Sequence, residues 1–186
     1  FFFLFERMGV KNAVVSSVYP DVLAEKLAGY FDRVLVDAPC SGEGMFRRDP
    51  AAVQEWSPAH VETCAVRQLA ILKSAARCVR AGGVLVYSTC TFSAEENEGV
   101  VRAFLAENPG FVLEKPAVSF GRPAYGLDAV RIFPMDGGEG HFAARFRYAA
   151  GNACAVQPHE GQAARPAGGE GRGGYKERCE EREGGG

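Results

Sequence analysis

The stretch LVDAPCSGEGMF, Leu35 to Phe46, is an apolar run that ends in an acid, a proline and a cysteine, followed by glycines. A second stretch, LVYSTCTFSAEENE (Leu85 to Glu98), also ends an apolar run at a cysteine in a polar turn. Such runs are typical of strands covered on both faces of an open parallel sheet. Ligands bind outside the carboxyl ends of these strands, so we expect Cys40 and Cys90 to approach each other across one cleft.

Strand and helix patterns alternate around these two stretches. Expected in chain order are a strand over 13–18, a helix over 20–28, a strand over 31–36, and a helix over 58–79 with apolar residues at spacings of three and four. Gly82 and Gly83 follow as expected C-terminal cap residues of the last helix. Ser93 and Glu96 have the spacing of a capping box, which predicts that a helix begins there and runs to about Glu107.

After Gly110 the pattern changes to strands only. The segments FVLEK, AVRIF and HFAARFRY have apolar residues in the alternation that is typical of antiparallel strands. The order of elements therefore predicts an α/β fold with a mostly parallel sheet and an antiparallel C-terminal edge.

Composition limits the classes of protein to consider. The 186 residues are 47% hydrophobic, and 21 Lys and Arg nearly balance 23 Asp and Glu, so the overall charge does not indicate a nucleic-acid or membrane partner. The six cysteines form no CxxC pair and have no histidine at zinc-ligand spacing, so neither a metal site nor a disulfide framework is predicted. We expect a reducing, cytoplasmic location. The opening FFFLF is too short for a signal peptide or a membrane span.

The cysteines fall into three groups. Cys64 and Cys78 lie in the long amphipathic helix, where cysteine usually packs as a small buried apolar residue. Two more lie in the Gly-rich segment 150–186, which is expected to be disordered. Cys40 and Cys90 lie in polar turns after strands, the setting in which reactive thiols are found.

Two reactions use a lone cysteine and remain as alternatives. A thiol phosphatase places an arginine after five intervening residues, whereas six separate Cys40 from Arg47. Acyl transfer needs a histidine base, and no motif connects His60, His141 or His159 to a cysteine. Both interpretations are therefore weak.

Three segments together resemble the Sun family of RNA (cytosine-C5) methyltransferases, in the type that modifies small-subunit ribosomal RNA. They are DAPCSGEGMFRRDP (37–50), EWSP (55–58) and YSTCTFSAEENE (87–98). RIFPMDGGEGHFAARF (131–146) is similar to the closing strands of that catalytic domain. The resemblance covers about residues 6–148. It implies a Rossmann-like class I methyltransferase sheet, S-adenosylmethionine as methyl donor, and RNA as substrate.

The chemistry of this family explains two thiols. Carbon 5 of cytosine is a poor nucleophile, so a thiolate first adds to carbon 6, and carbon 5 of the covalent adduct then accepts the methyl group. The resemblance implies that Cys90 is this nucleophile and that Cys40 assists loss of the carbon 5 proton and release of the enzyme. It implies that Asp37 orients the base and borders the methyl donor. Substrate contacts are expected from Pro39, Cys40, Ser41, Gly42 and Arg47.

Two neighbours of these residues carry further expectations. The helix expected to begin near Ser93 presents its positive N-terminal end to Cys90, which would lower the pKa of that thiol. Arg47 or Arg48 would contact RNA phosphate, or else be a solvated surface charge. Trp56, the single tryptophan, is expected to pack in the core, with stacking on a base as the alternative.

The sequence departs from the family pattern at its N-terminal side. The glycine-rich loop that holds the donor has no counterpart, and no G-x-G-x-x-G occurs. We therefore expect residues 1–5 to be unassigned and residues 6–149 to form the C-terminal part of a catalytic domain without its N-terminal strands. Its sheet would then have an exposed hydrophobic edge. The alternative function is an inactive, truncated RNA-binding remnant that needs a partner.

Overall fold

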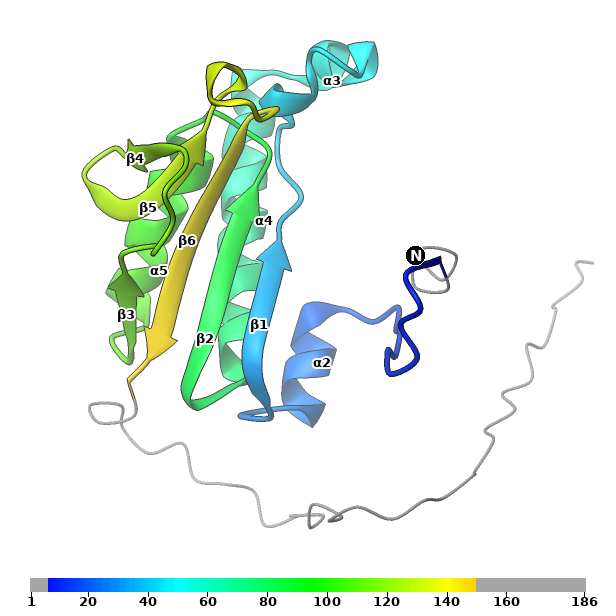
Figure 1. Ribbon diagram of the computed structural model, residues 1–186. Coiled ribbons are helices and arrows are strands. Elements are labelled where there is room, and N and C mark those ends of the chain that lie inside the picture. Colours follow the sequence, from blue (N-terminus) through cyan, green and yellow to red (C-terminus); the bar gives the residue numbers. More distant parts are fainter. Residues whose placement is uncertain (1–6, 150–186) are drawn as a thin grey trace, which may run out of the picture. The chain divides into compact units, whose positions relative to one another are not determined.

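The computed structural model describes residues 7–149 (Figure 1). Its helical elements are α2 (Pro20–Lys26), η1 (Glu43–Met45), α3 (Pro50–Glu55), α4 (Pro58–Arg77), η2 (Glu95–Gly99), α5 (Val100–Glu107) and η3 (Pro134–Asp136). Its strands are β1 (Phe31–Asp37), β2 (Val79–Thr89), β3 (Phe111–Glu114), β4 (Arg122–Ala124), β5 (Leu127–Ile132) and β6 (His141–Tyr148). None of the helices in this part of the chain is both long and apolar enough to cross a membrane.

The strands form one mixed sheet in the order β1-β2-β6-β5-β4, with β3 also paired to β6. β1 and β2 are parallel, and their arrows in Figure 1 point the same way, whereas β6 runs antiparallel to β2. The pairings of β6 with β3 and β5, and of β5 with β4, are also antiparallel. The predicted α/β class with an antiparallel C-terminal edge is confirmed.

The register of the parallel pair positions the two motifs. Asp37 at the end of β1 lies opposite Ser88 of β2, and the amide of Ala38 donates to the carbonyl of Ser88 at 2.9 Å. Cys40 is the third residue after Asp37, and Cys90 is the second after Ser88. Both cysteines therefore leave the sheet at the same end of adjacent strands.

The core lies between the sheet and the two helices α4 and α5, which cover one face of it (Figure 1). Leu85, Tyr87, Phe142 and Phe146 alternate along β2 and β6 and are fully buried. Phe104 of α5 packs edge-on against Phe146, with ring centroids 5.0 Å apart. Burial of each such side chain contributes about 1.5–3 kcal/mol, so this layer holds the thiol end of the sheet on a rigid base.

The opposite face of the sheet is covered by none of the described helices. Leu35 points to this side and is 68% exposed, so the expectation that β1 is covered on both faces is wrong for these residues. Among the described strands β1 pairs only with β2, which leaves its outer edge free. A cavity of about 280 Å³ follows that edge, with Leu23, Ile71 and Asp37 among its lining residues.

Two further expectations are wrong. Residues 13–18 form no strand and are exposed, because a β-rich composition needs a neighbouring strand and the described chain offers none there. Gly82 and Gly83 do not end a helix: α4 ends at its cap residue Cys78, and β2 begins at once. Gly82 has a φ of 72° beside an irregularity in the β1–β2 register, so its left-handed backbone serves a strand instead.

Candidate active site

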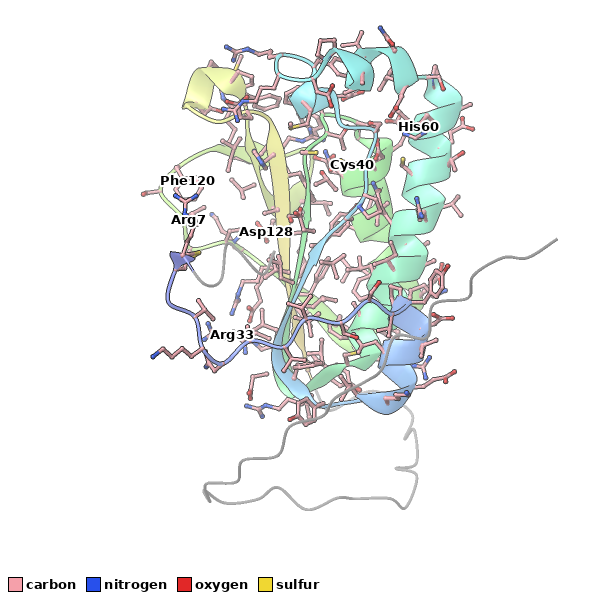
Figure 2. The ribbon with its side chains drawn as sticks, turned by 90° about the vertical axis from the view of Figure 1, so that its right-hand side faces the viewer. Arg7, Arg33, Cys40, His60, Phe120 and Asp128 are labelled. Atoms are coloured by element: carbon pink, nitrogen blue, oxygen red, sulfur yellow. The ribbon has the colours of Figure 1, made fainter. Side chains whose placement is uncertain are left out.

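The two predicted cysteines meet beyond the ends of β1 and β2. The Sγ atoms of Cys40 and Cys90 are 3.2 Å apart, and both residues are half-buried free thiols. Figure 2 shows Cys40 at the same end of the molecule as His60, away from Arg33 near the start of β1. The predicted approach of the two thiols is confirmed by this contact.

This contact separates the acidities of the two thiols. A hydrogen bond from the Cys40 thiol stabilises the Cys90 thiolate and lowers the pKa of Cys90 to about 7, against the opposing effects of burial and of Asp37. The same contact, together with burial, raises the pKa of Cys40 above its ordinary value. The predicted direction for Cys90 is therefore right, but the largest cause is the neighbouring thiol and not the helix after it.

Direct contacts between the two loops hold the thiols together. The hydroxyls of Ser41 and Thr91 are 2.9 Å apart, and the amide of Gly44 donates to the carbonyl of Cys90 at 2.8 Å. Ser41 and Thr91 are both buried, so loss of this hydrogen bond would leave the Ser41 hydroxyl without a partner in the described part of the chain. Each cysteine is thus flanked by a group that bonds to the other loop.

Gly44 is a close backbone crossing. A Cβ atom at this position would lie 2.6 Å from the carbonyl oxygen of Gly140 and 2.8 Å from that of Cys90. Gly140 has a φ of 121°, and a Cβ there would collide with the ring of Phe92. Only glycine lets the β5–β6 connection pack against both thiol loops at this distance.

Glu43 is a third link between the loops. Its Oε2 atom accepts from the amide of Phe92 at 2.9 Å, and its Oε1 atom accepts from the indole N–H of Trp56 at 2.9 Å. Trp56 is 37% exposed, so the expectation that it packs in the core is wrong. Its indole N–H, which requires a polar partner, keeps it at the rim of the site.

A buried polar cluster lies beneath the Cys40 loop and was missed by sequence reasoning. The Oε2 atom of Glu96 accepts from the amide of Ser41 at 3.0 Å and from Gln68 Nε2 at 2.7 Å. Gln68 Nε2 also donates to the carbonyl of Pro39 at 3.0 Å, and the hydroxyl of Tyr87 donates to Gln68 Oε1 at 3.0 Å. The one available signal was a glutamine on the apolar face of α4.

The predicted capping box is only half formed. The amide of Glu96 donates to Ser93 Oγ at 3.3 Å, as the pattern requires. The carboxylate of Glu96 turns instead to the Cys40 loop, and the Ser93 amide bonds to Thr91 Oγ1 at 3.2 Å. The helix begins as a π-helical turn, η2, and continues as α5.

A second buried cluster lies beneath the Cys90 loop. Glu98 accepts from Arg131 Nε at 2.8 Å and forms an ion pair with its Nη2 atom, and both side chains are about 1% exposed. Arg131 also donates to the carbonyl of Phe92 at 3.0 Å and lies over the ring of Tyr125. Burial alone raises the pKa of Glu98, but hydrogen bonds from Arg131 and the Tyr125 amide outweigh it and lower that pKa.

The remaining predicted site residues lie around the thiols. Asp37 is exposed at the end of β1 and accepts from Ser88 Oγ at 3.0 Å. Gly42 has a φ of 74° with open space where a side chain would be. Arg48 pairs with Glu139 at 2.7 Å, whereas Arg47 is exposed and has no ion pair within residues 7–149.

The geometry disfavours both weaker alternatives. A phosphatase loop needs free backbone amides, but those of Ser41 and Gly44 already bond to Glu96 and to the Cys90 carbonyl. His60 has its polar contact with Cys64, at 3.6 Å between Nε2 and Sγ, and not with either site cysteine. Cys64 and Cys78 are buried, as predicted, whereas Cys154 and Cys179 lie outside the described residues.

Comparison with known proteins gives one consistent family. Residues 4–147 match the model of the 16S rRNA methyltransferase RsmB/F family. Ribosomal RNA small subunit methyltransferase F of Erwinia tasmaniensis is 38% identical over 157 residues, which are 82% of this chain and 33% of that protein. The enzyme of the same name from Serratia proteamaculans is 40% identical over 146 residues, which are 76% of this chain and 30% of that protein.

Solved structures agree with this match. NSun6 from Pyrococcus horikoshii, crystallised with SFG, is 35% identical with a TM-score of 0.67 over 77% of this chain and 36% of that one. This chain therefore shares its fold with that protein over 77% of its own length. The chain spans about a third of the length of the curated relatives it matches.

Proposed function

This chain belongs to the 16S rRNA methyltransferase RsmB/F family, and we propose that it takes part in transfer of a methyl group to carbon 5 of cytosine in small-subunit ribosomal RNA. The relatives that carry the same segment are named for methylation of that RNA. The proposed substrate is a cytosine that is unpaired or flipped out of its stack, because a thiol cannot reach carbon 6 inside a duplex.

The observation that carries this proposal is the contact between the two thiols. Their Sγ atoms are 3.2 Å apart, and the pKa of Cys90 falls to about 7 while that of Cys40 rises. One thiolate and one thiol are thus present together near neutral pH. A reaction that needs an attacking sulfur and a second sulfur for proton transfer requires this pair.

Cys90 is the proposed nucleophile. Its thiolate forms a bond from Sγ to carbon 6, and the electron pair of the 5,6 double bond becomes available at carbon 5. Carbon 5 would then bond to the donor's methyl group as the bond between that methyl group and the sulfonium sulfur breaks, which leaves the electron pair on a neutral thioether sulfur. Formation of the bond removes the negative charge that holds the proton on Cys40. The Cys40 thiol then loses that proton to solvent and becomes a base.

Cys40 completes the reaction. Its thiolate takes the proton from carbon 5, the electron pair of that C–H bond restores the 5,6 double bond, and the bond between carbon 6 and Cys90 breaks. Cys90 leaves as thiolate and Cys40 is again a thiol, so both side chains return to their starting states. One proton has passed to solvent for each methyl group transferred.

Asp37 is the proposed base-orienting and donor-facing group. Its carboxylate is exposed at the carboxyl end of β1 and accepts hydrogen bonds, as the exocyclic amine of cytosine requires. Pro39, Gly42 and Arg47 are proposed to contact the RNA from the same loop. Ser41, predicted to do the same, is buried, and its amide and hydroxyl bond to Glu96 and Thr91.

S-adenosylmethionine, the proposed donor, carries an electrophilic methyl group on a sulfonium cation. NSun6, the structural relative, was crystallised with SFG, an analogue of that donor. The charge of Asp37 suits such a cation, and the cavity at the free edge of β1 includes Asp37 in its lining. The other residues of that lining are apolar, so the described residues supply one part of a donor site.

Trapping on RNA that contains 5-azacytidine tests the proposal. The protein, expressed over its complete reading frame, should form a covalent adduct that Cys90→Ala abolishes and that Cys64→Ala, a matched substitution in α4, leaves intact. With ordinary cytosine, Cys40→Ala should accumulate adduct because release is blocked. An undiminished adduct in Cys90→Ala would remove the assignment. RNA binding without any calorimetric S-adenosylmethionine binding would support the non-catalytic remnant.

A further inference from the structure

Glu96 connects the helical segment after Cys90 to the loop that carries Cys40. It is fully buried, and its Oε2 atom accepts from the Ser41 amide at 3.0 Å and from Gln68 at 2.7 Å. Glu96 lies six residues after Cys90, and Ser41 directly follows Cys40. One carboxylate oxygen therefore ties the two thiol-bearing segments together.

Gln68 of α4 adds further hydrogen bonds that hold the Cys40 loop. Its Nε2 atom donates both to Glu96 and to the carbonyl of Pro39, at 2.7 Å and 3.0 Å. The peptide groups on both sides of Cys40 are thus held, the preceding one through its carbonyl and the following one through its amide. The single hydroxyl proton of Tyr87 is shared between Gln68 Oε1, at 3.0 Å, and the carbonyl of Glu96, at 2.7 Å.

The charge of Glu96 has no counter-ion among residues 7–149. Its hydrogen-bond donors are an amide and a glutamine, and its Oε1 atom is buried with no partner in the described part of the chain. A buried carboxylate without a cation is costly to fold, and such groups are concentrated at functional sites. This carboxylate contacts the residue next to Cys40, so the thiol pair is the functional group on which it would act.

We propose that Glu96, acting through Ser41 and Gln68, is a positioning residue that holds Cys40 at contact distance from Cys90 for the methyl transfer proposed above. The inference rests on that function only for its catalytic consequence, since the contacts themselves involve no substrate. The negative charge of Glu96 also opposes ionisation of Cys90, together with Asp37 and against the hydrogen bond from Cys40. Glu96 thereby keeps a proton on the thiol pair.

The rate at which diamide oxidises Cys40 and Cys90 to a disulfide reports how well the two thiols are held in contact. The azo group of diamide takes two electrons and two protons from Cys40 and Cys90 and becomes a hydrazine. Glu96→Ala, which removes two charge-assisted hydrogen bonds, should slow formation of this disulfide by roughly tenfold or more, as followed by peptide mass spectrometry. Glu96→Gln retains an acceptor oxygen and should restore most of the rate.

The matched control is Glu95→Gln. Glu95 is the exposed neighbour of Glu96, and within residues 7–149 its side chain bonds only to Ser93, so its substitution should leave the rate at the wild-type value. Gln68→Met keeps the side-chain volume but removes both hydrogen bonds that Gln68 donates. It tests the same support of the Cys40 loop if Glu96→Ala fails to fold. Wild-type rates in folded Glu96→Ala and Gln68→Met would overturn the proposal.

A second measurement separates charge from structure. Iodoacetamide alkylation of Cys90 across a pH series should show a lower midpoint in Glu96→Gln than in wild type, because the opposing charge is gone. An unchanged midpoint would overturn the electrostatic part. Neither assay uses RNA or a methyl donor. A failure of 5-azacytidine trapping alongside slow cross-linking in Glu96→Ala would therefore reject the methyl transfer and retain the positioning role.

Discussion

Two buried glutamates of one motif support the two thiol loops in different ways. Glu98 pairs with Arg131, which bonds to the Phe92 carbonyl in the Cys90 loop. Glu96, two residues earlier, has only neutral hydrogen-bond partners among the described residues, one of them in the Cys40 loop. Both carboxylates are fully buried, so the difference lies in their partners and not in their exposure.

We propose that this difference separates a structural cluster from one that serves the reaction. A carboxylate matched by a guanidinium adds rigidity and little net charge, and it suits the loop whose shape must not change. An unmatched carboxylate leaves its negative charge beside the thiols, where the proposed reaction moves protons. The predictions below test this contrast, beginning with the largest effect.

Loss of the cation should cost the most. Arg131→Met leaves Glu98 as an unpaired buried charge, so the free energy of unfolding should fall by about 3–5 kcal/mol. Urea denaturation measures this loss. The double variant Glu98→Leu with Arg131→Met removes both charges and should be more stable than Arg131→Met alone. Equal stability of Arg131→Met and wild type would show that the ion pair contributes nothing.

The second largest loss of stability is expected from a methyl group added at Gly44, where the backbones cross closely. Gly44→Ala forces the Gly140 and Cys90 carbonyls away from the Cys40 loop and should destabilise the fold by about 1–3 kcal/mol, as overpacking does. Thermal unfolding with a denaturant series gives the value. Gly99→Ala, where the nearest atom is 3.3 Å from the new Cβ, is the control and should change stability by at most about 1 kcal/mol. Equal effects of the two substitutions would contradict the crossing.

The shared proton should appear in the pH dependence of alkylation. Cys90 reacts as thiolate, so its rate should rise with pH and level off above the pKa of about 7. Cys40→Ala removes the stabilising donor and returns that pKa toward the ordinary thiol value, so the rate at pH 7 should fall roughly tenfold. Cys40→Ser retains a donor and should lie between these. The same midpoint pH of Cys90 alkylation in wild type, Cys40→Ala and Cys40→Ser would contradict the contact between the two thiols.

The smallest effect belongs to the half-buried carboxylate of Glu43. Trp56→Phe removes the bond to Glu43 at the rim of the site, where water replaces the lost partner. The expected loss of stability is about 0.5–1 kcal/mol. Fluorescence is lost with the tryptophan, so circular dichroism should follow the unfolding. A loss as large as that of Arg131→Met would show that the rim is as important as the buried pair.

The fold and the thiol pair were within reach of the sequence because their signals are local. The apolar runs before Cys40 and Cys90 mark two strand ends, and parallel strands bring such ends together. The long helix α4 and the buried face of α5, with Val100, Val101 and Phe104, also follow from helical spacing.

What could not be predicted depends on partners distant in the chain. Glu96 satisfies a local capping pattern, yet its carboxylate bonds to Ser41, 55 residues away. Arg131 lies between two apolar residues of a strand, a position from which a charged side chain normally faces solvent. It is buried instead, because its charge is paired with Glu98 on another element. Gly82 shows the same ambiguity, because a left-handed glycine ends a helix or bends a strand equally well.

The register of β1 against β2 makes the site sensitive to chain length. Asp37 lies opposite Ser88, and the two thiols are counted from that pair, three residues along one strand and two along the other. Deletion of a single residue between Asp37 and Cys40 would draw the Cys40 sulfur back toward the end of β1 and away from Cys90, and loss of Ala38 would also remove a buried core residue. Evolution can therefore exchange side chains around this site more freely than it can gain or lose residues within it.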